Sequence, residues 1–262
     1  MSYTFIDTHC HFDFPPFTGA EAESLHLAGE SGIREIIVPA VTADRFLGIL
    51  ALAKNYPQIH AALGLHPLYI AQHKEQDLEL LEAFLSHRDA RLVAVGEIGL
   101  DLYMESPMFE QQQRLLKAQF SLAKKENLPV ILHSRRSHDQ LAAMLRQAKL
   151  PATGVVHGFA GSLSQAQAFI KLGYAIGVGG TISYERAQKT RQVMAQLPLS
   201  SLLLETDAPD MPLQGFQGQP NRPERAAAVF DVLCELRTES AQEIANTLLA
   251  NTRRVFQLSA LQ

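Results

Sequence analysis

The sequence predicts an α/β fold, a (β/α)8 TIM barrel with an extra C-terminal helix, in a single domain that spans residues 1–262. Short apolar runs alternate with longer amphipathic stretches from end to end, which is typical of parallel β-α units. Eight such units fit the length of the chain, because closed barrels of this kind take about 250 residues. An open, doubly wound sheet is the alternative fold that the same alternation allows.

The eight expected strands are short and rich in Val, Ile or Leu, as strands buried on both faces should be. They cover residues 4–7, 35–39, 59–64, 92–96, 129–132, 154–156, 174–178 and 202–205. In a barrel, the carboxyl ends of such strands form the face that carries the active site. Residues that directly follow the strands are therefore the first candidates for function.

Four helices are expected to begin with a capping box, in which a Ser or Thr precedes a Glu or Gln by three residues. These pairs are Thr18 with Glu21, Ser137 with Gln140, Ser162 with Gln165, and Ser240 with Glu243. Pro107 suits the first position of a helix that extends to about Glu126. The last pair opens the extra helix, expected over residues 241–256. The loop 209–223, rich in Pro, Gly and Gln, follows the eighth strand and is a candidate active-site loop.

The composition limits the classes of function and the compartment. The net charge of −4 does not indicate a broad basic surface for nucleic acid. Cys10 and Cys234 are too few for a disulfide framework, so a reducing compartment is expected. The sequence shows no signal peptide, and no apolar run reaches the ~18 residues of a membrane span. We therefore expect a cytoplasmic monomer without membrane contact.

Residues with metal-ligand chemistry follow several of the expected strands. His9 and His11 lie two residues apart on an extended segment, so their side chains share one face. His66, His133 and His157 follow later strands in the same way. Two unrelated histidines in an exposed turn would explain the first pair alone. They would not explain the repetition at strand ends, which indicates a metal site.

Glu97 and Asp207 are the carboxylates expected to complete this site. Glu97 follows a run of apolar residues, where an unpaired charge would be costly. Either a metal or an ion pair with an arginine such as Arg135 would offset that cost. Because both oxygens of a carboxylate accept, Glu97 could bridge two cations. Asp207, nearer the barrel mouth, is expected to be a ligand and the catalytic base, with Glu205 as a buried supporting group.

The strand-end motifs resemble those of the TatD family of metal-dependent deoxyribonucleases, within the amidohydrolase-like barrels, and we expect the YjjV branch of that family. The resemblance covers nearly the whole chain. It rests on Asp7-Thr8-His9-Cys10-His11, Gly64-Leu65-His66-Pro67, Gly96-Glu97-Ile98-Gly99-Leu100-Asp101, His133-Ser134-Arg135 and Glu205-Thr206-Asp207-Ala208-Pro209, with Asn221 and Pro223 in the next loop.

The resemblance implies two metal sites, catalytic carboxylates and a set of substrate contacts. The first metal would be held by His9, His11, Glu97 and Asp207, and the second by Glu97, His133 and His157. Glu97 and Asp207 would be catalytic, while the substrate contacts would be His66, Arg135, Asp101 and Asn221. The chain departs from the family pattern at Leu102, Gly158 and Arg222. These departures remove no ligand but leave the substrate preference open.

The site predicts a hydrolase that uses two divalent cations (Zn, Mn, Mg, Co or Fe) to activate a water. The expected substrate is DNA or another phosphodiester, because Arg135 is a planar donor suited to a phosphate. One alternative is a metal-dependent hydrolase of small amides, lactones or phosphoesters, since a fold does not fix a function. The other is a non-catalytic binding protein that a metal stabilises.

Overall fold

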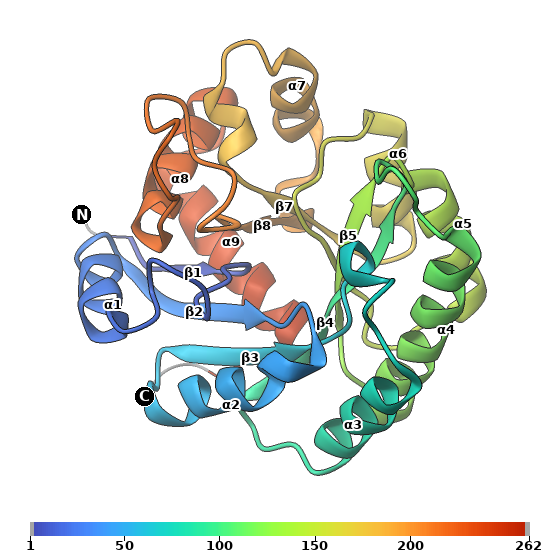
Figure 1. Cartoon of the computed structure of the whole chain (residues 1–262). Coiled ribbons are helices and arrows are strands. Elements are labelled where there is room, and N and C mark those ends of the chain that lie inside the picture. The colour runs from blue at the N-terminus through green and yellow to red at the C-terminus, as the bar shows by residue number, and fades with distance from the viewer. Residues whose placement is uncertain (1–2, 260–262) are drawn as a thin grey trace.

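Within residues 3–259, which the computed structural model describes, eight strands form one sheet in the order of the chain (Figure 1). The strands are β1 (Phe5–Asp7), β2 (Ile33–Pro39), β3 (Ile59–Leu63), β4 (Leu92–Asp101), β5 (Val130–Arg135), β6 (Gly154–Val156), β7 (Ala175–Val178) and β8 (Leu202–Leu204). Each strand pairs in parallel with the next. All eight predicted strands are therefore confirmed.

Helices follow the strands and cover the outside of the sheet (Figure 1). They are α1 (Glu21–Glu30), α2 (Phe46–Asn55), α3 (Glu75–Ser86), α4 (Phe109–Glu126), α5 (His138–Ala148), α6 (Leu163–Lys171), α7 (Gln188–Gln196), α8 (Ala226–Leu236) and α9 (Ala241–Phe256). Short 3-10 helices are η1 (Ala43–Arg45), η2 (Pro67–Tyr69), η3 (Gly180–Ser183), η4 (Leu199–Ser201) and η5 (Pro223–Arg225). None of the helices described is both long enough and apolar enough to cross a bilayer.

Backbone hydrogen bonds join the first and last strands of the sheet. The N–H of Thr8 donates to the carbonyl of Leu204 at 3.0 Å, and the N–H of Asp207 donates to the carbonyl of His9 at 2.8 Å. An open sheet would leave these edge groups without partners. The TIM barrel is thus confirmed, and the open doubly wound sheet is wrong.

Strands β4 and β5 continue beyond their predicted ends, to Asp101 and Arg135. The residues at these ends pair across the sheet, with Gly99 opposite His133 and Asp101 opposite Arg135. Gly99 has a φ of 148°, and a Cβ atom there would collide with the carbonyl oxygen of His133. Only glycine allows the two strands to approach so closely. These functional segments therefore belong to the sheet, which fixes their positions.

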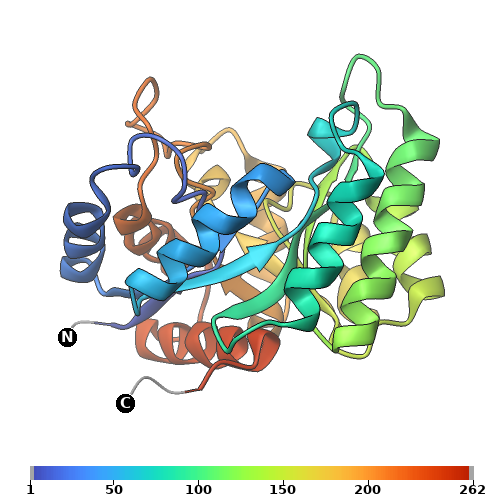
Figure 2. The same ribbon diagram turned by 60° about the horizontal axis from the view of Figure 1, so that its bottom comes forward.

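The end of the barrel opposite the predicted site is closed by α9. Val255 and Phe256 of this helix join a buried apolar cluster formed by the strands. Its other members are Ile6, Ile37, Ala62, Val93, Ala94, Ile131, Val155, Ala175 and Leu203. Arg253 anchors the same helix, because its Nη2 lies 2.9 Å from Oε1 of buried Glu35. Figure 2 shows α9 (red) lying across the lower end of the barrel, so the carboxyl ends of the strands remain the accessible face.

The predicted helix starts are confirmed in part. Ser162 and Gln165 form the full capping box of α6, and the Ser240 hydroxyl accepts from the N–H of Glu243 at the start of α9. Three predictions, for Thr18, Ser137 and Pro107, are wrong. Thr18 does not cap α1, which begins at Glu21.

The Ser137 hydroxyl does not cap α5, because it donates to the carbonyl of Leu100 at 2.9 Å. Pro107 lies before α4, which begins at Phe109 after Met108 in the left-handed region. The carbonyl of Pro107 instead accepts from the Gln112 side chain at 2.6 Å. For Ser137, a tertiary hydrogen bond takes the place of the local one that the sequence indicates.

Candidate metal centre

A cavity of about 1070 Å³ lies at the carboxyl ends of the strands, where the sequence predicts the site. The predicted residues on its wall are His11, His66, Glu97, His133, Arg135, His157 and Asp207. Phe14, Leu68 and Tyr69 add an apolar side from the loops after β1 and β3. Asp210 and Met211 also line the cavity, so the loop 209–223 borders it as predicted.

A bulge in β4 brings Glu97 into the centre of this site. Between Val95 and Ile98, the pairing advances by three residues on β4 but by two on β5. Such an extra residue changes the direction of the side chains around it. The N–H of Glu97 donates to the carbonyl of Ala40 at 2.9 Å, and the residue is 1% exposed. Its carboxylate is consequently held among histidines.

One oxygen of Glu97, Oε2, faces His9 and His11. The Nε2 atoms of these rings lie 3.1 and 3.4 Å from this oxygen. Oδ1 of Asp207 lies 3.5 and 3.6 Å from the same two nitrogens. Four nitrogen and oxygen donors therefore surround one point, which is the coordination that a divalent transition ion prefers.

The other oxygen of Glu97, Oε1, faces His133 and His157. Nδ1 of His133 lies 3.2 Å from it, and Nε2 of His157 lies 2.6 Å from it. Despite this short distance, Nε2 of His157 is a buried nitrogen that makes no hydrogen bond within residues 3–259. A cation placed between the nitrogen and the carboxylate would satisfy both groups.

Hydrogen bonds on the far sides of two rings decide where their protons lie. Nδ1 of His11 is 3.3 Å from the carbonyl of Pro39, which can only accept. Nε2 of His133 is 2.8 Å from Oδ2 of Asp101, which accepts in the same way. Each ring therefore carries its proton away from Glu97 and presents a lone pair to the centre. This orientation is the one that outer carboxylates and carbonyls impose on metal-binding histidines.

His66 differs from the other histidines around Glu97. Its Nε2 lies 2.9 Å from Oε1 of Glu97, close enough to group it with Glu97 and His133 as a candidate ligand. However, its Nδ1 accepts the N–H of Leu68 at 3.0 Å, so the proton of the neutral ring is on Nε2. Burial lowers the pKa of His66 to about 4, which keeps the ring neutral. His66 is thus a hydrogen-bond donor into the site and not a ligand.

The charges of the central groups depend on one another. Burial opposes ionisation of Glu97, but the neighbouring histidines, His157 first, hold its pKa well below the usual value. Burial also opposes protonation of His157, yet the charge of Glu97 and its contact with the ring raise this pKa to about 10. Burial raises the pKa of Asp207. The centre therefore favours Glu97 as a carboxylate, with positive charge on the neighbouring His157.

Glu205 lies behind the cluster as a buried carboxyl. Its Oε1 accepts from the N–H of Gly158 at 2.5 Å, which fixes the turn that follows His157. A Cβ atom at Gly177 would collide with the Glu205 carboxylate, so a glycine makes room for it. Donor atoms of Glu205, His157 and His9 lie within 4.8 Å of one another. These contacts suit the supporting role expected for Glu205.

Two predicted substrate contacts are corrected. Asp101 is fully buried, and its carboxylate is used by His133 and by the N–H of Tyr103 at 2.8 Å. Asn221 is also fully buried, and its side chain donates to the carbonyls of Thr206 and Met211. Neither residue lines the cavity. Asp101 instead orients a candidate ligand, and Asn221 holds the loop after β8.

Arg135 lines the cavity but does not pair with Glu97, so the ion-pair alternative for that carboxylate is not supported. Its guanidinium carbon lies 3.9 Å from the centroid of the Tyr103 ring. The guanidinium carbon of Arg136 lies 4.3 Å from the same centroid. The sequence reasoning missed Tyr103 and Arg136. Each directly follows a residue that the sequence singles out, since Tyr103 follows Leu102 and Arg136 follows Arg135.

The family model described as TatD related DNase matches residues 6–257. The chain belongs to the TatD family. It is 63% identical over 256 residues to the uncharacterized metal-dependent hydrolase YjjV of Escherichia coli (strain K12), across 98% of this chain and 99% of that protein. An uncharacterized metal-dependent hydrolase of Haemophilus influenzae is 47% identical over 259 residues, across 96% of this chain and 99% of that protein.

The solved structure of YjjV, a TatD homolog from Escherichia coli K12, has a TM-score of 0.97 and 62% identity to this TatD-family chain. The match covers 99% of this chain and 100% of the YjjV chain. A hydrolase of the TatD family from Entamoeba histolytica, at 22% identity, shares the fold with a TM-score of 0.83. The predicted family is confirmed, and the similarity to YjjV agrees with the predicted branch.

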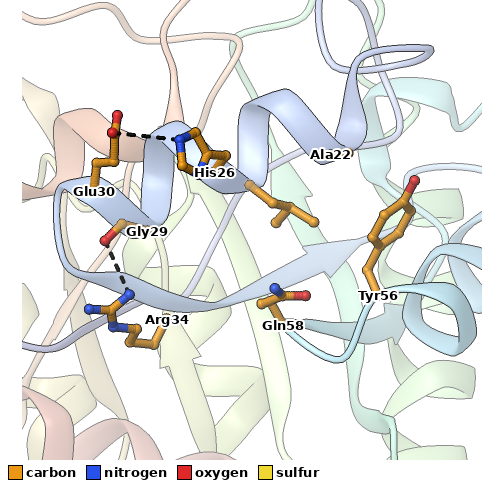
Figure 3. A pocket seen from close by; sticks show the side chains of 8 residues that line it. Ala22, His26, Gly29, Glu30, Arg34, Tyr56 and Gln58 are labelled. Atoms are coloured by element: carbon orange, nitrogen blue, oxygen red, sulfur yellow. Dashed lines mark hydrogen bonds and ion pairs between the residues drawn. The ribbon is translucent and has the colours of Figure 1, made fainter.

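A second hollow of about 540 Å³ lies outside the barrel, between α1 and the starts of β2 and β3 (Figure 3). On α1, Nε2 of His26 lies 3.6 Å from Oε1 of Glu30, and both side chains are exposed. Arg34, Tyr56 and Gln58 complete the lining. Among the described residues, the groups that could hold a metal ion all lie at the barrel mouth instead. The mouth is therefore the candidate catalytic site of this TatD-family protein.

Proposed function

We propose that this protein is a metal-dependent hydrolase that cleaves phosphodiester bonds, with DNA as its substrate. The observation that carries the proposal is the division of the Glu97 carboxylate between two groups of ligands. The family model, whose description names a DNase, supports the choice of nucleic acid. The metal-dependent hydrolases at 63% and 47% identity support the reaction class.

Two divalent cations fit the residues of the site. The first would be held by His9, His11, Glu97 and Asp207, and the second by Glu97, His133 and His157. When bound, the cations would lower the pKa of a water and stabilise negative charge on the phosphate. The nitrogen and oxygen donors suit Zn, Mn, Co or Fe, and the carboxylates also admit Mg.

The residues of the chain supply the remaining functions. Asp207 is the base, because its side chain is 19% exposed, it lines the cavity, and burial raises the pKa of its carboxyl. His66 holds a proton on Nε2 that it can donate to a phosphate or leaving oxygen. Arg135 presents an unpaired guanidinium to the phosphate from the cavity rim. The buried histidines around Glu97 exclude bulk water from the centre.

A substrate panel tests this function. Protein loaded separately with Zn, Mn, Mg, Co or Fe is incubated with labelled single-stranded DNA, double-stranded DNA and RNA, and with small phosphoesters, amides and lactones. We expect metal-dependent cleavage of DNA, abolished by a chelator. Cleavage confined to small neutral esters would support the small-molecule hydrolase instead. No turnover in any metal-loaded sample, with tight metal retention, would support the non-catalytic binding protein.

A further inference from the structure

Tyr103 shares its ring with two arginines at the edge of the cavity. The guanidinium carbons of Arg135 and Arg136 lie 3.9 and 4.3 Å from the ring centroid. Tyr103 is 50% exposed, and both arginines line the cavity that contains the candidate metal centre. Guanidinium groups stack on aromatic rings and leave their N–H groups free at the edge. The stack therefore places two oriented cations beside the site.

Neither guanidinium group forms a hydrogen bond or an ion pair with any residue that the structure describes. Each guanidinium has five N–H donors. Arg45, which stacks on the cavity-lining Phe14, differs from them. It lies 3.5 Å over the Phe14 ring and also pairs with Asp13 at 2.8 Å. The arginines on Tyr103 have the stacking contact without the carboxylate, so their donors are available to an anionic ligand.

The stack is tied to the candidate metal centre through one carboxylate. Oδ1 of Asp101 accepts from the N–H of Tyr103 at 2.8 Å, while Oδ2 lies 2.8 Å from Nε2 of His133. Arg135 follows His133 by two residues on β5. The distance between the stack and the second group of ligands is thus set by buried contacts and does not depend on a loose surface loop.

Arg136 is held in an unusual backbone conformation. Its φ is 53°, in the left-handed region that residues with a side chain disfavour. Glycine or asparagine would adopt this conformation more easily. An arginine that keeps it, with its side chain on the cavity rim, fits the pattern in which backbone strain accompanies a functional position.

We propose that Arg136, with Tyr103, forms a subsite for a second phosphate, next to the phosphodiester that is cleaved. The proposal rests on the proposed function, and it specifies the substrate as a nucleic-acid strand with at least two phosphates. The scissile phosphate occupies the metal centre and Arg135. The next phosphate along the strand then meets Arg136, and Tyr103 keeps the two guanidinium groups apart and oriented.

Short thymidylates of defined charge test the subsite. The dinucleoside phosphate TpT has one phosphate, and the trinucleotide TpTpT has two. For the metal-loaded wild type, we expect kcat/KM per cleavable bond to be about tenfold higher for TpTpT, through a lower KM, which is the effect of one charge-assisted contact. Arg136→Gln should bring this ratio close to one, and Tyr103→Leu should lower it. Arg136→Lys, which keeps the charge but not the stacked plane, should give an intermediate ratio.

The matched control is Arg34→Gln, an arginine on the hollow outside the barrel, which should keep the wild-type ratio. Thermal melting of every variant confirms that the comparison is made on folded protein. A wild-type ratio near one, or an unchanged ratio in folded Arg136→Gln, would overturn the subsite.

A binding measurement separates this subsite from the proposed function. Fluorescence anisotropy follows a labelled pentathymidylate with phosphorothioate linkages, which are charged and resist cleavage. Arg136→Gln should weaken its binding about tenfold and reduce the slope of log K against log salt by about 0.7. A probe with neutral methylphosphonate linkages should bind the wild type and the variant equally. If DNA is not cleaved, the proposed function fails, whereas equal binding of the charged probe to both proteins removes the subsite.

Discussion

The carboxylate of Asp101 lies 2.8 Å from Nε2 of His133, on the side of the ring away from the nitrogen that faces Glu97. Gln112 of α4 fixes the backbone of Asp101, since its side chain accepts from the backbone N–H of Asp101 and donates to the backbone carbonyl of Asp101, both at 2.8 Å. Burial opposes the charge of Asp101, but the contact with His133 holds its pKa below the usual value. A helix outside the barrel thereby orients a candidate ligand inside it.

Asp101→Asn should weaken the second metal site without unfolding the protein. The amide keeps the volume but loses the charge that holds the proton on Nε2 of His133. Losing such an outer contact typically costs about 10–100-fold in metal affinity or activity. Competition with a chelating dye measures the affinity of each site. Asp44→Asn, a change on η1 away from the centre, is the control and should match the wild type; equal affinities in all three proteins would refute the orienting role.

Removing His9 and His11 together should abolish one metal site and spare the other. The double change to Ala deletes two of the four donors of the first group, which also contains Oε2 of Glu97, while His133 and His157 on Oε1 remain. Metal analysis after gel filtration should show at least one divalent ion fewer per chain than in the wild type. A double variant that keeps the wild-type metal content at unchanged affinity would show that these histidines are not ligands.

Much of this centre could be predicted from the sequence because its candidate ligands directly follow apolar strands. His9 and His11 share a face on an extended segment, and the structure places their Nε2 atoms 3.3 Å apart. Asp101 and Asn221 could not be assigned correctly in the same way. Both stand in strand-end or loop motifs, but only the packing around them shows that internal partners use their side chains.

The ends of β4 and β5 show a second limit of sequence reasoning. Polar motif residues such as Asp101 and Ser134 interrupt the apolar pattern, so the pattern predicts that the strands end before them. In the structure, both residues pair within the sheet. The predicted cap of α5 is absent for a related reason. Ser137 bonds to the distant Leu100 carbonyl, which no local pattern encodes. Local signals give the order of the elements, while tertiary contacts determine which polar group meets which.

Glu97→Gln should leave a folded protein with activity reduced by several orders of magnitude. The amide has one oxygen and one nitrogen, so it cannot present an anionic acceptor to both groups of ligands. Metal-assisted catalysis contributes several kcal/mol, and about 1.4 kcal/mol corresponds to a factor of ten. Steady-state cleavage of DNA and circular dichroism measure activity and fold. Near-normal turnover in a folded variant would exclude the bridging role of Glu97.

The Glu35 cluster below the barrel should make stability depend on pH. Oε2 of Glu35 lies 2.6 Å from Nε2 of His60, and Oε1 lies 2.9 Å from Arg253 of α9. Burial opposes its charge, but His60 and then Arg253 lower the pKa of Glu35. Its pKa is thus lower in the folded than in the unfolded chain. This stabilisation is fully present above the unfolded pKa and is lost as the pH falls through the folded one.

Glu35→Gln should therefore destabilise the protein by about 1–3 kcal/mol at pH 7, because the partly buried guanidinium of Arg253 loses its charged partner. Urea denaturation at pH 7 and near pH 3.5 measures the free energy of unfolding of both proteins. The difference between them should shrink at the lower pH, where the wild-type carboxyl begins to take up its proton. A difference that is constant with pH would mean that packing, and not the charge, holds α9 at this point.

Arg135→Lys should weaken phosphodiester cleavage while the metal content stays at the wild-type level. The lysine keeps the positive charge but loses the planar, two-pronged donor and the stacking on Tyr103.

The chain has a net charge of −4, so attraction to DNA acts over a short range at the mouth and not over the whole surface. Salt should consequently reduce DNA binding by the wild type with a shallow slope, since few phosphates are neutralised. Kinetics of both proteins on a short oligonucleotide at two salt concentrations, with metal analysis of the same samples, measures each part. Equal kinetics would remove Arg135 from the substrate site, and a steep slope would reveal a wider basic surface than the cavity rim provides.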